Sequence, residues 1–249
     1  MTPLPTHHRQ PETWNELDLE AWQRTLTVNL TGVFAVTKAA WPIFVQQGYG
    51  RCVMTASPAM YGSGVAAYAA SKSALIGLAA SLQFEARKLK LDIKVNTVIP
   101  QADTRMTRDF ATDIAARKKA AGKKASKGGG VPAEVMALMA PEKVSAMVAW
   151  LCHRSCAGEA TVHEAGAGFF AQLRWERSAP LFATEAEGVI GAPDPEHIRD
   201  GLATLADFET RGKGHAPKSG DGSMGGPNAI EFLLAHLKES SSDNSNSKL

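Results

Sequence analysis

The regular alternation of apolar helical segments with short β-branched segments most limits what this chain can fold into. Residues 18–47 carry apolar side chains at helical spacing behind Asp18, a residue type that favours the position before a helix. The pattern then indicates a strand at 51–57, a second helix at 66–90 and a β-branched strand at 92–100. Helices and strands in this order predict parallel β–α–β units.

A third repeat of the pattern follows. Residues 141–153 form an amphipathic helical segment with Pro141 in its first turn, and residues 160–168 indicate a strand that runs into glycines. We therefore expect an α/β fold. The chain is expected to divide into an α/β domain at 1–180, a helical extension at 181–237 and a flexible polar tail at 238–249.

The composition limits the classes of function. Of the 249 residues, 44% are hydrophobic and 21% are charged, which is typical of a globular protein with a core. A net charge of +2 gives no reason to expect nucleic acid, and because no run approaches roughly 18 consecutive apolar residues we expect no membrane span. No metal site is predicted, because the short spacing of Cys152 and Cys156 lacks the second pair of ligands that zinc sites usually have.

The end of the chain predicts a location. The tail at 238–249 is rich in serine, and its last three residues form the peroxisomal import signal: Ser247, Lys248 and Leu249. We therefore expect a peroxisomal protein that binds the import receptor through these residues.

Tyr68 and Lys72 are the first candidates for chemistry. They stand four residues apart on the predicted helix 66–90, so one turn brings both onto the same face. A phenol beside an ammonium is a plausible proton-transfer pair, because the cation stabilises the phenolate. A surface pair without chemistry is the alternative for both.

Four segments together resemble the short-chain dehydrogenase/reductase family. They are "TVNLTGVF" on the first helix, "GRCVMTAS" at the first strand, "YAASK" on the second helix and "VNTVIPQADTRMT" from the second strand onward, in the family's usual order. The segment "AGAGFFAQLRWER" is similar to the (3R)-3-hydroxyacyl-CoA dehydrogenase region of peroxisomal multifunctional enzymes of type 2. The resemblance covers about residues 14–180.

The resemblance implies a role for each matching residue. Tyr68 matches the base that takes the proton of a substrate hydroxyl while hydride passes to a nicotinamide, and Lys72 matches the residue that stabilises it and holds the nicotinamide ribose. Asn29 matches an asparagine that holds a water in the proton relay, and a buried amide paired for structural reasons is its other reading.

One catalytic assignment stays open between two residues. The family's serine, which polarises the substrate oxygen, is assigned to Ser57 because it follows the strand. Only eleven residues separate Ser57 from Tyr68, fewer than is usual in the family, and the usual separation points to Thr55 instead. Ser57 in a simple turn before Pro58 is the non-functional alternative.

The resemblance also implies a cofactor and partners. Tyr68, Lys72, Pro100 and Thr104 are expected to bind the cofactor, with Thr104 as the donor to the nicotinamide end. NAD is expected on the resemblance alone, an acyl-CoA is the expected substrate, and a homodimer is expected because helices of this kind pack together in the family.

A dinucleotide fold also needs a strand that runs into a glycine-rich turn and a helix, which receive the pyrophosphate. No such pattern precedes the helix at 18–47, so we expect the C-terminal part of a Rossmann-like, doubly wound parallel sheet in three α/β/α layers, lacking the first strands. Residues 220–225 match G-x-G-x-x-G by letter, but no strand precedes them and Pro227 follows, so they are not assigned to a nucleotide.

Two functions are carried forward from the sequence. The first is oxidation of (3R)-3-hydroxyacyl-CoA to 3-ketoacyl-CoA in peroxisomal fatty-acid β-oxidation, impaired in this chain by the loss of the phosphate-binding loop. The alternative is a non-catalytic fragment or a dimerising interaction protein.

Overall fold

The computed structural model describes residues 14–62, 65–109, 112, 133–175, 178, 181–182, 191 and 194–206. It consists of two compact units, Met1–Leu173 and Arg174–Leu249, which are described separately. The import signal in the tail at 238–249 and the glycine segment at 220–225 lie outside the described residues. The predictions made on them, and the predicted boundary at 180, therefore stay predictions.

Four strands form one sheet in the order β1-β2-β3-β4. Their bounds are Tyr49–Thr55 for β1, Asp92–Gln101 for β2, Val162–Gly166 for β3 and Phe169–Leu173 for β4. The first three strands run parallel, as predicted. Strand β4 pairs antiparallel with β3, which makes the sheet mixed; the sequence predicted only a glycine turn there.

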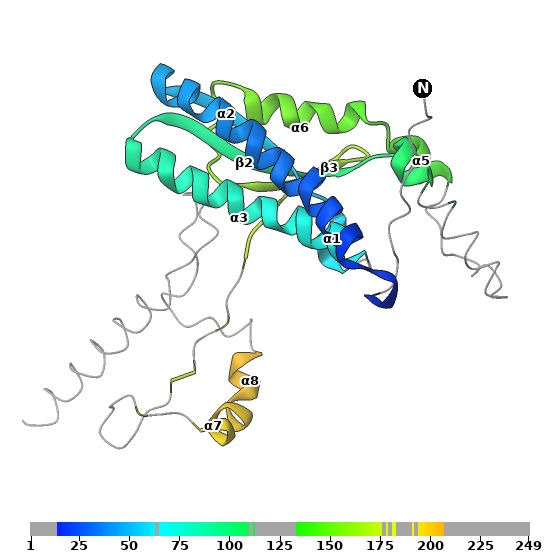
Figure 1. The fold of residues 1–249 in the computed structure, drawn as a ribbon, viewed down its shortest axis with the longest axis vertical. Helices are drawn as coiled ribbons and strands as arrows, with labels where there is room; N and C mark the ends of the chain where they lie inside the picture. The colour runs from blue at the N-terminus through cyan, green and yellow to red at the C-terminus, as the bar shows by residue number, and fades with distance from the viewer. Residues whose placement is uncertain are drawn as a thin grey trace, which may run out of the picture. The chain divides into compact units, whose positions relative to one another are not determined.

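Helices cover both faces of the sheet. Figure 1 shows strands β2 and β3 between helix α6 (Glu142–Cys152) and the pair α2 (Gly32–Gln47) and α3 (Ala66–Leu89). Met54 packs into the core beneath α2 and α3, whereas its neighbour Val53 packs beneath α6. Successive residues of β1 thus point to opposite faces, as a strand requires. The predicted three-layer α/β/α arrangement is confirmed.

The first long helix has three parts. Asp18 caps α1 (Leu19–Leu26), with a carboxylate oxygen that accepts a hydrogen bond from the backbone N–H of Ala21 at 2.7 Å. A π-helical turn, Thr27–Thr31, joins α1 to α2. Helix α2 then continues through Pro42. Its end at Gly48 takes the left-handed conformation, with φ 68°, that glycine adopts without strain.

In the part of the chain that the structure describes, two helical stretches are long and apolar enough to cross a membrane by length and composition alone: Leu19–Gln47 and Val135–Cys152. Neither stretch is a run of consecutive apolar residues, and the expectation of no membrane span stays a prediction. The first stretch packs one side into the core, where Trp41 is 8% exposed. The second is interrupted between α5 (Ala133–Leu138) and Pro141, which precedes α6.

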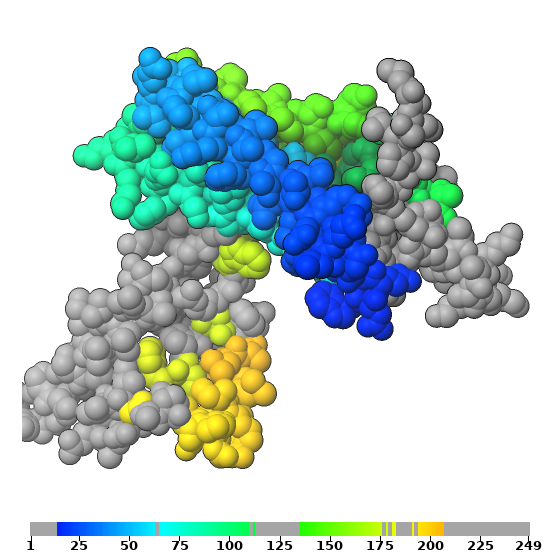
Figure 2. Space-filling view, viewed as in Figure 1, coloured from blue at the N-terminus to red at the C-terminus, as the bar shows by residue number. Residues whose placement is uncertain are grey.

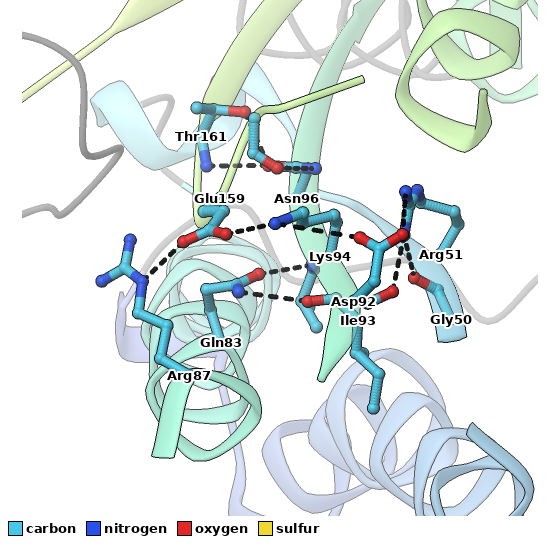
Figure 3. A network of polar contacts seen from close by, with 12 residues as sticks. Gly50, Arg51, Gln83, Arg87, Asp92, Ile93, Lys94, Asn96, Glu159 and Thr161 are labelled. Atoms are coloured by element: carbon cyan, nitrogen blue, oxygen red, sulfur yellow. Dashed lines mark hydrogen bonds and ion pairs between the residues drawn. The ribbon is translucent and has the colours of Figure 1, made fainter. Parts of the chain in front are cut away.

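The loop before β3 is fixed by a buried amide (Figure 3). The Asn96 side-chain oxygen accepts hydrogen bonds from the Thr161 backbone N–H at 2.9 Å and from its hydroxyl at 2.6 Å. Its side-chain nitrogen donates to the carbonyl of Gly158 at 3.0 Å. Because Asn96 is completely buried in β2, these bonds satisfy an amide that water cannot reach.

A charged cluster continues this network toward α3. The Glu159 carboxylate accepts from Arg87 of α3 at 2.7 Å and pairs with Lys94 of β2 (Figure 3). Gln83 of α3 donates to the Ile93 carbonyl at 3.1 Å and accepts from the Val95 N–H at 2.8 Å. These contacts fix α3 against β2, and α3 is the helix that carries Tyr68.

The second unit contains two short helices among its described residues, α7 (Pro195–Asp200) and α8 (Leu202–Leu205). Asp194 caps α7 by accepting from the His197 N–H at 2.7 Å. This is consistent with a helical extension.

Candidate active site

Tyr68 and Lys72 lie one turn apart at the start of α3. The Lys72 Nζ lies 5.8 Å from the centre of the Tyr68 ring, and it donates a hydrogen bond to the carbonyl of Thr55 at 2.9 Å. Burial lowers the pKa of Lys72 from its usual value. The Tyr68 hydroxyl makes no hydrogen bond within the part of the chain that the structure describes. A phenol without an internal partner beside a partly desolvated ammonium can exchange a proton with a bound molecule.

Asn29 reaches this pair through Ser71. The Asn29 amide lies in the π-helical turn Thr27–Thr31 and donates to the Ser71 hydroxyl at 3.3 Å. Ser71 is completely buried and donates in turn to the backbone carbonyl of Tyr68 at 2.7 Å. The half-buried Asn29 amide is thus paired, with a side-chain hydroxyl in place of a backbone or water partner. The π turn is itself informative, because such turns occur frequently at functional sites.

The two candidates for the serine role lie at the end of β1. Ser57 is half-buried, and its hydroxyl accepts from the Ala59 N–H at 3.2 Å. It caps the single 3₁₀ turn η3 (Pro58–Tyr61). Thr55 contributes its carbonyl to Lys72, while its side chain is exposed. The turn role of Ser57 is thus observed, and neither hydroxyl contacts Tyr68 among the described hydrogen bonds.

Pro100 and Thr104 lie on the α6 side of the sheet. They line a mostly apolar cavity of about 460 Å³ together with Ala102, which follows β2, and with residues of α6 and its N-terminal end: Pro141, Val144, Ser145, Val148 and Ala149. The Thr104 hydroxyl lies 3.0 Å from that of Thr107 and accepts from the Thr107 N–H at 3.2 Å. The structure thus brings Asn29, Tyr68 and Lys72 together, and no described hydrogen bond joins them to this cavity.

Two further contacts involve residues that the sequence did not single out. Ser71 links Asn29 to α3, and a serine three residues after Tyr68 is a recognisable signal for a bond to the backbone within a helix. Tyr61 donates to Glu164 of β3 at 2.8 Å. No local pattern indicates that pair, because 103 residues separate its members.

A model of the short chain dehydrogenase family matches residues 7–115. These residues include β1, the Asn29 helix, the Tyr68–Lys72 pair and β2. The peroxisomal multifunctional enzyme type 2 of Mus musculus is 34% identical over 196 residues, which are 78% of this chain and 23% of the relative. The chain belongs to the short-chain dehydrogenase family.

Other relatives and solved structures agree with this assignment. The peroxisomal hydratase-dehydrogenase-epimerase of Saccharomyces cerevisiae is 36% identical over 171 residues, which are 68% of this chain and 16% of the relative. The full-length peroxisomal multifunctional enzyme type 2 of Drosophila melanogaster superimposes with a TM-score of 0.67 at 21% identity, over 94% of this chain and 36% of that chain. The chain thus spans under a quarter of the two curated enzymes.

Dehydrogenases of this family use a nicotinamide cofactor, NAD or NADP. An NAD⁺-bound xylitol dehydrogenase superimposes with a TM-score of 0.50 at 22% identity, over 66% of each chain. The described residues include a partly desolvated lysine and, separately, an apolar cavity, which are groups of the kind that the nicotinamide end of such a cofactor contacts. They contain no G-x-G-x-x-G turn between a strand and a helix, so they do not fit the pyrophosphate end.

Proposed function

We propose that this short-chain dehydrogenase chain carries the chemistry that oxidises (3R)-3-hydroxyacyl-CoA to 3-ketoacyl-CoA in peroxisomal β-oxidation, with NAD as cofactor. The observation that carries the proposal is the Tyr68–Lys72 pair, held at the start of α3 by Asn29 and Ser71. The multifunctional relatives and the import signal at Ser247, Lys248 and Leu249 support the substrate class and the location.

In this proposal Tyr68 takes the proton of the substrate hydroxyl. Lys72 stabilises the phenolate form of Tyr68 that accepts this proton, and its own lowered pKa makes it a better proton donor than a free lysine. The hydroxyl of Ser57, or that of Thr55, orients the substrate oxygen. A bound nicotinamide would supply the acceptor for the hydride that leaves the same carbon. Pro100 and Thr104 would hold its ring at the cavity beside α6.

Binding of NADH to the purified chain tests the proposal, with fluorescence titration up to millimolar concentrations. We expect weak, saturable binding, because the described residues supply the nicotinamide end and not the pyrophosphate end. We also expect NAD reduction with a 3-hydroxyacyl-CoA, lowered at least about a hundredfold by Tyr68→Phe. Tyr49→Phe is the matched control, because it removes a phenol of β1 whose ring stacks against Arg51 and Arg154. If the folded chain showed no NADH binding and no turnover, the proposal would be contradicted.

A second candidate function is a dimerising protein without catalysis. Figure 2 shows α1 and α2 along the visible surface of their unit, and α2 with the turn before it carries three exposed apolar side chains at helical spacing. Val28 is 68%, Val36 73% and Ile43 59% exposed. Such a stripe is suited to pack against its copy in a homodimer.

Light scattering after size exclusion tests the dimer. Val36→Glu places a charge in the stripe and is expected to give monomers. Lys38→Glu introduces the same residue at another exposed position of α2 and is expected to leave the dimer intact. A monomeric wild-type chain contradicts this second candidate and leaves the first untouched.

A further inference from the structure

We propose that Tyr61, acting through Glu164, is a positioning residue for Ser57. This inference rests on the proposed function, in which the Ser57 hydroxyl orients the substrate oxygen. It assigns a role to two residues that the Tyr68–Lys72 pair does not involve.

The contact connects a short turn to the sheet. The Tyr61 hydroxyl donates to a carboxylate oxygen of Glu164 at 2.8 Å. Glu164 lies in the middle of β3, opposite Ile99 of β2 on one side and Ala171 of β4 on the other. Glu164 therefore belongs to a strand that is hydrogen-bonded to a neighbour on each side, and its bond to Tyr61 attaches the turn Pro58–Tyr61 to this rigid part of the sheet.

Ser57 and Tyr61 lie at the two ends of the same turn. The hydroxyl of Ser57 accepts from the Ala59 N–H, and its carbonyl accepts from the Met60 N–H at 3.2 Å. One further bond, from the Gly62 N–H to the Ala59 carbonyl at 3.0 Å, completes η3. A single 3₁₀ turn has few bonds of its own, so its orientation depends on what anchors its ends.

The anchor stays intact over the working range of pH. Partial desolvation, with the neighbouring Glu164 carboxylate, raises the pKa of Tyr61 to about 12. The phenol therefore remains protonated and keeps donating its hydrogen bond at neutral and mildly alkaline pH. A phenol with a raised pKa is suited to anchor the turn and unsuited to act as the base, so the role of Tyr61 differs from the role proposed for Tyr68.

Hydrogen exchange followed by mass spectrometry tests the anchor without requiring activity. Tyr61→Phe and Glu164→Ala are expected to speed exchange in the peptide covering residues 57–62 by about tenfold, because each removes the same hydrogen bond to a charged group. Glu164→Gln keeps an acceptor oxygen and is expected to resemble the wild type. Tyr49→Phe is the control for loss of a phenol elsewhere.

The kinetic test uses NAD reduction with a 3-hydroxyacyl-CoA. Tyr61→Phe is expected to lower kcat about tenfold with little change in KM, since a displaced hydroxyl weakens orientation more than binding. The double variant with Glu164→Ala is expected to be no slower than either single variant, because both changes break one contact. The pH dependence of kcat is expected to keep its wild-type shape.

The outcomes distinguish a failure of the Tyr61 anchor from a failure of the proposed dehydrogenase function. Unchanged exchange at 57–62 in both Tyr61→Phe and Glu164→Ala overturns the inference whatever the activity. A loss of activity in Tyr61→Phe as complete as that in Tyr68→Phe also overturns it, because Tyr61 would then act as a proton donor. An inactive wild type with faster exchange in the variants contradicts the proposed function and supports the anchor.

Discussion

The Asn29 amide donates to the buried hydroxyl of Ser71 at 3.3 Å, across 42 residues of sequence and between two packed helices. Since Ser71 also donates to the carbonyl of Tyr68, this one contact ties the π-helical turn of the first helix to the first turn of α3. The hydrogen bond that pairs the Asn29 amide is thus also the one that links Asn29 to the helix of Tyr68, so a structural role and a role in the site are compatible.

Ser71→Ala is expected to destabilise the folded chain by about 1–2 kcal/mol, because it leaves the Asn29 amide and the Tyr68 carbonyl without their shared partner. Ser81→Ala is the matched control on the same helix. Its hydroxyl also bonds a backbone carbonyl, that of Gly77 at 2.9 Å, but it is exposed. Urea unfolding of both variants checks the prediction, and equal losses would count against a special role for Ser71.

Asn96→Ala is expected to cost about 3 kcal/mol, because it removes the side-chain partner of the Thr161 backbone N–H and of the Gly158 carbonyl. Asn15→Ala, at an exposed position, is expected to change stability by less than about 0.5 kcal/mol. Thermal unfolding measures both. A small effect of Asn96→Ala would mean that water replaces the amide.

Thr97→Val is expected to leave stability unchanged or raise it by up to about 1 kcal/mol. The Thr97 hydroxyl is buried in β2 without a hydrogen-bond partner among the described residues, so a methyl group of the same shape removes an unsatisfied group. Denaturant unfolding measures the change. Thr161→Val is the contrast, since that hydroxyl bonds Asn96 and its loss is expected to be destabilising.

Glu159→Gln is expected to destabilise the chain at neutral pH and less so in acid. Burial alone would raise the pKa of Glu159, but hydrogen bonds and charges from Lys94 and Arg87 outweigh it and lower that pKa. A lowered carboxyl pKa contributes stability above the unfolded value of about 4.3, and this stability is lost as the pH falls through the folded value.

The difference in unfolding free energy between wild type and Glu159→Gln should therefore be largest above about pH 5 and shrink below about pH 4. Glu20→Gln removes an exposed carboxylate paired with Arg24 at 3.5 Å, and it is expected to shift stability by less than about 0.5 kcal/mol throughout. A difference for Glu159→Gln that stays constant over this range would contradict the assignment.

Local signals predicted most of the elements. The cap at Asp18, the strand at 92–100 and the shared face of Tyr68 and Lys72 all follow from short-range patterns, and the structure contains them. Strand β4 was missed because its residues are mostly exposed and follow a glycine turn, so they show no alternation of buried and exposed positions. Pairing with β3 makes it a strand.

Contacts between residues far apart in the chain could not be predicted from the sequence. The pairing of Tyr61 with Glu164 depends on the register of three strands, and the bond from Lys72 to the Thr55 carbonyl depends on how α3 lies against β1. The sequence placed Ser57 after a strand and offered a turn before Pro58 as one alternative, and the structure shows its hydroxyl capping that turn. The hydrogen-bond partner of a hydroxyl group depends on which groups the tertiary structure places beside it, and local sequence patterns do not determine that.

The π-helical turn at Thr27–Thr31 has a consequence for how this helix tolerates change. A wider turn holds one residue more than a regular one, so the side chains on its two sides are out of phase. Removing a single residue there would restore a regular helix, while rotating all of α1 by about 100° against α2 and withdrawing Asn29 from Ser71. Deleting one residue within Thr27–Thr31 is therefore expected to destabilise the fold more than any single substitution there, although loops tolerate such deletions well.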